Sequence, residues 1–137
     1  MNAVPDKVVV RGVLVKLLHH RRDDRGMTVI PEASRCVRVG EVHELVTTDH
    51  RDLVAGSRVN RVGFLGFAEI GNAGVLEVGD RVLLGEREVG VLVGFDDCHF
   101  PNHYNVLIET PETLTAEAAG AEVGAVVTFA PPVRRTP

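Results

Sequence analysis

Valine-rich runs recur along the whole chain, and no helical apolar period extends beyond about four turns. Valine is the commonest residue and there are 14 glycines, a composition that favours strands and tight turns over long helices. A chain of 137 residues has the usual size of one domain and can bury a single core. We therefore predict one all-β domain over residues 1–137, a small closed or partly open β-barrel of about six to eight strands with one or two short helical turns.

The predicted strands are separated by turns rich in glycine, proline or charge, and they cover residues 7–18, 27–30, 35–39, 58–70, 76–84, 88–95, 104–110 and 122–129. The tight turn at 85–87 predicts a hairpin, which is the clearest element in the chain. The polar run 19–26 predicts another hairpin, with the first strand bent at Gly12. Residues 115–119 suit one helical turn, and we expect the tail from 131 to 137 to fray.

Residues 41–54 are ambiguous between helix and strand. Their apolar residues suit one helical face, but Asp49 falls on that face too. We interpret the segment as a strand or turn followed by one helical turn, capped by Thr48 and closed by Gly56. Its acidic residues and histidines are expected to form a solvated surface.

A weak internal repeat aligns residues 73–82 with residues 119–127, and both copies carry a Val-Gly turn before a strand. These turns resemble those of small β-barrels such as the translation-factor barrel domains and the double-psi barrels. The resemblance implies an architecture and carries no function. In the strand 89–95, strict alternation would leave Gly90 and Gly94 on one nearly bare face, which indicates barrel curvature or the close approach of a ligand or another backbone.

Charge and composition exclude several classes of function. A net charge of -4, a pI near 5.8 and an aromatic content of 4% argue against a nucleic-acid-binding surface. Charged residues interrupt the longest apolar run, so we expect no membrane span and no export signal, and hence a cytoplasmic protein. Its two cysteines are then expected to be free thiols. The preference for arginine over lysine hints at a GC-rich bacterial genome.

The densest group of chemically useful side chains lies in residues 96–105, which read Asp-Asp-Cys-His-Phe-Pro-Asn-His-Tyr-Asn between two predicted strands. Loops held by rigid strands are where binding and catalytic groups concentrate, and the Pro-Asn pair favours a turn. Such a turn can bring both histidines together. We expect one concave site at the end of the two strands, lined by Asp97, His99, His103 and Tyr104.

Imidazoles suit proton transfer near neutral pH, so His99 and His103 are the expected acid and base. Asp97 would orient an imidazole, and Tyr104 would hydrogen-bond developing negative charge. Further substrate contacts are expected from Asn102, Cys98, Glu109 and Gly94; among these Glu109 is an alternative acid carried on a strand.

Two other chemistries use the same segment. Cys98, His99 and His103 could ligate a transition metal, but adjacent residues of an extended segment point to opposite faces and no C-x-x-C pair is present. Cys98 could act as a nucleophile only with a neighbouring base and a lowered pKa. We therefore expect neither a metal nor a cofactor.

The hypothesis that follows is a small cofactor-independent enzyme of the lyase, isomerase or cyclase type acting on a small polar metabolite. The alternative is a non-catalytic β-barrel that binds a ligand or a protein partner with the same loop. A third possibility is that the loop residues serve turn hydrogen bonds alone. A homodimer stays open, and the sequence names neither substrate nor reaction.

Overall fold

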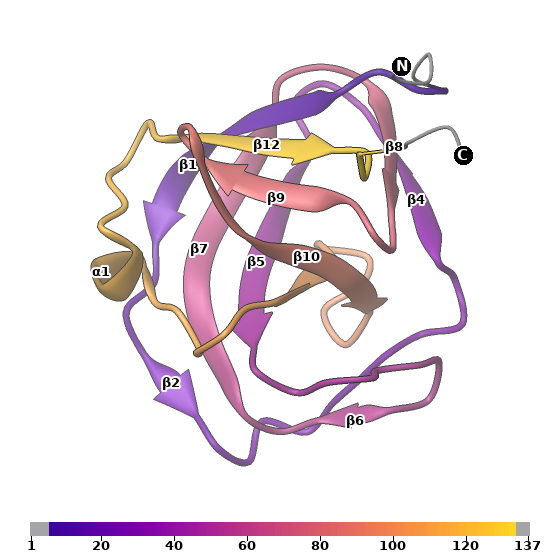
Figure 1. Cartoon of the computed structure of the whole chain (residues 1–137), viewed down its shortest axis with the longest axis vertical. Helices are drawn as coiled ribbons and strands as arrows, with labels where there is room; N and C mark the ends of the chain where they lie inside the picture. Colours follow the sequence, from indigo (N-terminus) through magenta and orange to yellow (C-terminus); the bar gives the residue numbers. More distant parts are fainter. Residues whose placement is uncertain (1–5, 134–137) are drawn as a thin grey trace.

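A computed structural model describes residues 6–133, which form an almost entirely β-stranded fold (Figure 1). Seven strands of one sheet close into a ring, because the first and last of the series pair with each other. In ring order they are β1 (Val10–Leu17), β12 (Val126–Ala130), β9 (Arg81–Leu84), β10 (Arg87–Asp96), β11 (Asn105–Glu109), β5 (Val42–Thr48) and β7 (Val62–Ile70). The all-β prediction is confirmed.

Five further strands and one helix complete the described fold. β2 (Arg21–Arg22) pairs with β7, β3 (Met27–Thr28) pairs with β6 (Arg58–Val59), and β4 (Ser34–Val37) pairs with β8 (Gly74–Glu77). The single described helix, α1 (Ala116–Ala119), is the expected helical turn; the Thr115 hydroxyl accepts from the Ala118 amide at its start. No helix within residues 6–133 is long and apolar enough to cross a membrane.

One pairing in the ring is parallel, and it positions the candidate site. β11 runs parallel to β5 with Asn105 opposite Glu44, whereas the other pairings of the ring are antiparallel. Parallel strands begin at the same edge of a sheet. The loop that leads into β11 therefore lies beside the first residues of β5, although the two segments are about 60 positions apart in sequence.

Strand β5 is buried on both faces, which explains the difficulty of interpreting residues 41–54. Leu45 belongs to the main core cluster, and its neighbour Val46 belongs to a second cluster formed with β3, β6, β7 and β11. A strand covered on both sides does not alternate between buried and exposed residues, and β5 also carries buried polar residues, so it lacks the pattern of a half-buried strand. Its register against β7 and β11 supplies the backbone hydrogen bonds that a helix would otherwise have made internally.

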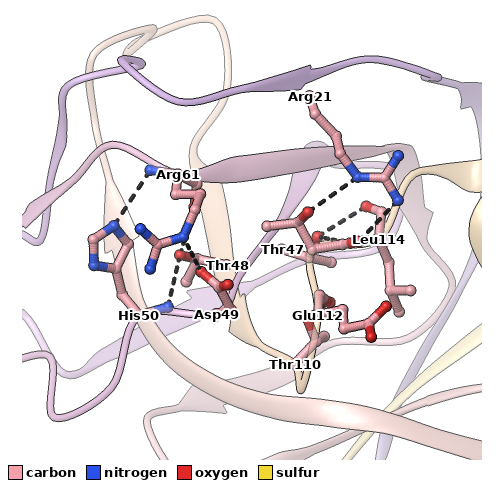
Figure 2. Close-up of polar contacts among 10 residues, drawn as sticks. Arg21, Thr47, Thr48, Asp49, His50, Arg61, Thr110, Glu112 and Leu114 are labelled. Carbon is pink, nitrogen blue, oxygen red and sulfur yellow. Dashed lines mark hydrogen bonds and ion pairs between the residues drawn. The ribbon is translucent and has the colours of Figure 1, made fainter.

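The expected helical turn after Thr48 is wrong. Thr48 ends β5 as a buried residue, and its hydroxyl donates to the carbonyl of Arg61 at 2.7 Å and accepts from the amide of His50 (Figure 2). Asp49 forms an ion pair with the Arg61 guanidinium at 2.6 Å, and Thr47 exchanges hydrogen bonds with the backbone of Leu114. Contacts with distant segments override the local capping signal.

The hairpin predicted around residues 19–26 is also wrong. β1 begins at Val10 and pairs with β12 and β7, while the short strand at Met27 pairs with β6 instead. The hairpin joining β9 and β10 is confirmed. The two Val-Gly turns of the internal repeat precede β9 and β12, and their glycines, Gly79 and Gly124, both have positive φ angles.

The expected bare face of β10 does not exist. Two β-bulges, near Val89 and Val93, break the alternation, and Leu92 and Phe95 both enter the main core. A Cβ at Gly90 would lie 2.2 Å from the carbonyl oxygen of Glu109, and one at Gly94 would lie 2.8 Å from a Val29 methyl group. The glycines permit close packing, so Gly94 leaves no room for a ligand.

Candidate functional site

The candidate site lies where residues 97–104 meet the start of β5. The backbone amide of Tyr104 donates to Nδ1 of His43 at 3.1 Å, and the amide of Glu44 donates to the carbonyl of Tyr104 at 3.1 Å. These bonds fix the end of the loop against the strand. Parallel pairing of β5 and β11 thus places the histidines of the loop next to a carboxylate from a different part of the chain.

The loop histidine with the most defined environment is His103. Its Nε2 lies 3.1 Å from Oε1 of Glu44, and the two side chains are only 10% and 8% exposed. Phe67 packs against the imidazole edge-on, with ring centroids 5.1 Å apart. A buried carboxylate in this position fixes the orientation of the imidazole ring.

Glu44 is the important residue that the sequence interpretation missed. The acidic residues around it were expected on a solvated surface, whereas Glu44 and His43 are both buried. The expected orienting carboxylate, Asp97, is exposed and does not hydrogen-bond either loop histidine among the described contacts. Burial of a carboxylate is costly without a partner, but Glu44 stands among other polar residues in the sequence, so no local signal marked it as buried.

His99 lies on the exposed side of His103, with ring centroids 5.0 Å apart. Nη2 of Arg25 lies 3.3 Å from Nε2 of His99 and also 3.3 Å from Sγ of Cys98. A guanidinium only donates hydrogen bonds, so Nε2 of His99 is the acceptor in this contact. The two histidines are brought together as the turn predicted.

A cavity of about 280 Å³ opens between the loop, β4 and β5. Three predicted site residues, Asn102, His103 and Tyr104, line it, while Asp97, Cys98, His99, Glu109 and Gly94 do not. The other lining residues are Arg35, Arg38, Glu41, Val42, His43, Phe100 and Pro101. The two guanidinium groups of this lining outnumber its one carboxylate, Glu41, so the cavity has an excess of positive charge that suits an anionic ligand.

Arg35 and Tyr104 stand between this cavity and a smaller one. The guanidinium carbon of Arg35 lies 3.9 Å from the centroid of the Tyr104 ring, a cation–π contact. Both residues also line a cavity of about 220 Å³ on their other side. Nη2 of Arg35 donates to Glu41 at 3.2 Å, whereas its buried Nε has no hydrogen-bond partner.

Both ring nitrogens of His43 form hydrogen bonds within the protein, so this histidine has a structural role at the site. Nδ1 accepts from the Tyr104 amide, so Nε2 carries the proton and donates to Glu41 at 2.7 Å. Burial lowers the pKa of His43, and the hydrogen bond with Glu41 acts in the opposite direction. The positive charge of Arg35 lowers the pKa further, and the net result is a lowered pKa. Burial would raise the pKa of Glu41, but hydrogen bonds from His43 and the Arg38 amide lower it.

Asp96 anchors the first half of the loop. Its carboxylate accepts from the amides of Thr28 and Cys98 and from Nδ2 of Asn105. Burial opposes the charge of Asp96, yet these bonds hold its pKa below the usual value. Burial and Asp96 together raise the pKa of Cys98. A raised pKa disfavours the thiolate that a nucleophile needs.

The remaining expected residues lie elsewhere. Glu109 forms an ion pair with Arg51 at the opposite end of β11 from Tyr104. Both Cys98 and Cys36 are free, as expected.

A family model agrees with nearly the full length of the sequence. DUF6917, described as a family of unknown function, matches residues 4–130. No curated protein and no solved structure matches the sequence. The chain therefore belongs to the DUF6917 family.

Proposed function

We propose that this protein is a cofactor-independent enzyme that carries out acid–base chemistry, of the lyase, isomerase or cyclase type, on a small anionic metabolite. The reaction takes place in the 280 Å³ cavity, with His103 as the proton carrier. The observation that carries the proposal is the buried Glu44–His103 pair beside a cavity lined by two arginines. Carboxylate-oriented imidazoles are common proton carriers in enzymes.

The arginines define the substrate class. Guanidinium groups bind carboxylates and phosphates through paired, charge-assisted hydrogen bonds. Arg35 is held in place by Tyr104 and Glu41, whereas Arg38 is exposed at the cavity. The cavity volume suits a metabolite of modest size rather than a polymer.

The proton path begins at His103. Because Nε2 is engaged by Glu44, Nδ1 is the nitrogen available for exchange with a substrate. The Tyr104 hydroxyl and the Asn102 amide are the neighbouring groups that can hydrogen-bond developing negative charge. His99, 5.0 Å from His103 between ring centroids and exposed, provides a route for the proton to solvent.

A non-catalytic binding module is the competing function, and one observation favours it. Phe100 is 59% exposed at the cavity, and its ring contacts that of Tyr104 in a tilted arrangement with centroids 5.4 Å apart. An exposed aromatic side chain beside a cavity is typical of surfaces that recognise partners or ligands. The two functions share the ligand site and differ in whether His103 exchanges a proton with the ligand.

The experiment uses chelator-treated protein and a panel of small carboxylates and phosphates in D₂O. Binding is followed by tyrosine fluorescence, because Tyr104 is the only tyrosine and the chain has no tryptophan. Deuterium incorporation or product formation is followed by NMR. We expect His103→Gln to slow turnover by about 10²-fold or more. Glu44→Gln should lower kcat and shift its pH profile, and His19→Asn, a change at an exposed histidine, should have no effect.

Arg35→Gln should weaken binding of the same ligand without abolishing the fold. Full turnover in His103→Gln would overturn the acid–base proposal. Tight, Arg35-dependent binding with neither deuterium incorporation nor product would establish the binding module instead.

A further inference from the structure

We infer that Glu44, His99 and His103 form a binding site for one divalent transition-metal ion of the zinc type. One potential ligand atom from each residue lies within 4.8 Å of the other two. The inference stands on these three side chains and does not depend on the proposed enzymatic reaction.

The backbone places the three groups from two separate segments. Glu44 comes from the buried strand β5, and the histidines come from the loop. The amides of Asn102 and His103 both approach the carbonyl oxygen of His99, at 2.9 and 3.4 Å, and close a turn between the two histidines. The imidazoles consequently lie on one side of the loop, facing the carboxylate.

The distances suit a site that tightens when an ion enters. Zinc binds imidazole nitrogen and carboxylate oxygen at about 2.0–2.2 Å, so bound donor atoms approach one another more closely than 4.8 Å. Glu44 and His103 already lie 3.1 Å apart. His99 is exposed, and a change in its side-chain torsion angles can complete the set without moving the core.

The donor set identifies the type of ion. Two imidazoles and one carboxylate suit zinc and its neighbours in the first transition series, whereas calcium and magnesium prefer sites made of oxygen alone. Three protein ligands leave at least one position for water or an anion. Cys98, a candidate ligand in the sequence, does not belong to the cluster, because Glu44 supplies the third donor instead.

Two charged side chains near the site affect the binding of a cation in opposite directions. The Glu44 carboxylate is buried, so its attraction for a cation is weakly screened. The Arg25 guanidinium contacts His99 and repels a cation bound there. Arg25 therefore lowers the affinity of the site for a metal ion, and replacing it by a neutral residue should strengthen metal binding.

The test is a titration of chelator-treated protein with Zn²⁺ by calorimetry and with Co²⁺ by visible absorption, which reports tetrahedral coordination. We expect one ion per chain. Replacements of the ligands, Glu44→Gln, His99→Asn and His103→Asn, should each weaken binding about tenfold or more. His19→Asn should bind like the unmodified protein, and Arg25→Gln should bind severalfold more tightly.

His99→Asn is the decisive variant, because an exposed side chain can be replaced without unfolding the protein. Unchanged binding in His99→Asn, or in a folded Glu44→Gln protein, would overturn the site. Binding lost on replacing either histidine but not Glu44 would mean histidine capture at the surface and would also overturn it.

Metal binding and the proposed reaction can be separated. A metal-bound imidazole no longer alternates between its protonated and neutral forms, so zinc should inhibit proton transfer by His103. The Co²⁺ spectrum reports the site whether or not any substrate turns over, and turnover of chelator-treated protein reports the reaction whether or not zinc binds.

Discussion

Among individual residues, the buried polar groups of the site hold the loop through fixed partners. His43 uses both ring nitrogens, one on the backbone of Tyr104 and one on Glu41. Asp96 uses its carboxylate on the other side of the same loop. Such pairing stabilises the folded protein, because an unpaired buried polar group costs about 1–3 kcal/mol. The loop is consequently anchored at both ends while its middle carries the candidate chemistry.

The environment of His43 predicts a loss of stability on mild acidification. Its pKa is lowered from 6.5 in the folded protein, so the unfolded chain binds a proton more readily. The stabilising contribution is complete above about pH 6.5 and is lost as the pH falls through the folded pKa. Chelator-treated protein should therefore show a Tm that declines as the pH falls below 6.5.

His43→Gln should have a lower Tm at neutral pH but a smaller decline in this range, and His19→Asn should retain the full decline. Glu41 and Asp96 also have lowered pKa values, so their contributions are lost at more acidic pH, below their usual values of 4.5 and 3.8. An undiminished decline in His43→Gln would show that another group controls the stability just below pH 6.5.

Among the elements, β10 shows most directly how packing constrains sequence. Its two bulges change the face to which the side chains point, so that Val89, Leu92 and Phe95 all enter the main core. Gly90 lies against the backbone of β11. The glycine is required by space rather than by an unusual backbone angle, since its φ is not positive. Gly85, in the preceding turn, shows the opposite case: its φ is 62°, and nothing lies within 4 Å of the position that a Cβ would occupy.

This contrast predicts different costs for two alanine substitutions in one hairpin. Gly90→Ala drives a Cβ into a carbonyl oxygen and should lower the free energy of unfolding by about 3 kcal/mol. Gly85→Ala strains only the backbone and should cost about 1 kcal/mol. Urea unfolding followed by circular dichroism measures both. A larger cost for Gly85→Ala would contradict the tight contact between β10 and β11.

For the whole molecule, closure of the ring links the site to the core. β5 and β11 contribute to both core clusters, and the loop before β11 is held by the first residues of β5. Figure 1 shows β5 and β7 side by side across the body of the fold, where they connect the two clusters. Loss of either cluster should therefore release the site.

We predict that the site and the fold unfold in one transition. Tyr104 is the only tyrosine in a chain without tryptophan, so intrinsic fluorescence reports the site, while far-UV circular dichroism reports the strands. The two urea midpoints should coincide, as in two-state unfolding. A fluorescence midpoint at clearly lower urea would show that the loop opens while the ring persists.

The features that could be predicted from the sequence are those that depend on neighbouring residues. Valine-rich runs and glycine turns indicate an all-β chain, a three-residue turn indicates the β9–β10 hairpin, and Thr115 followed by alanines indicates α1. The polar density of residues 96–105 likewise marked the loop that brings His99 and His103 together. Alternation, turn chemistry and capping act over a few residues, so a short stretch of sequence is enough to predict them.

The partner of His103 and the conformation of residues 42–48 are set by tertiary contacts. Both depend on the parallel pairing of β5 with β11. This pairing brings Glu44 and His103 together, although they are 59 positions apart in the sequence. Local signals around Glu44 were compatible with helix and strand alike. Burial on both faces selected the strand, and the shared edge of the two strands placed the carboxylate against the imidazole, because non-local packing outweighs local propensity.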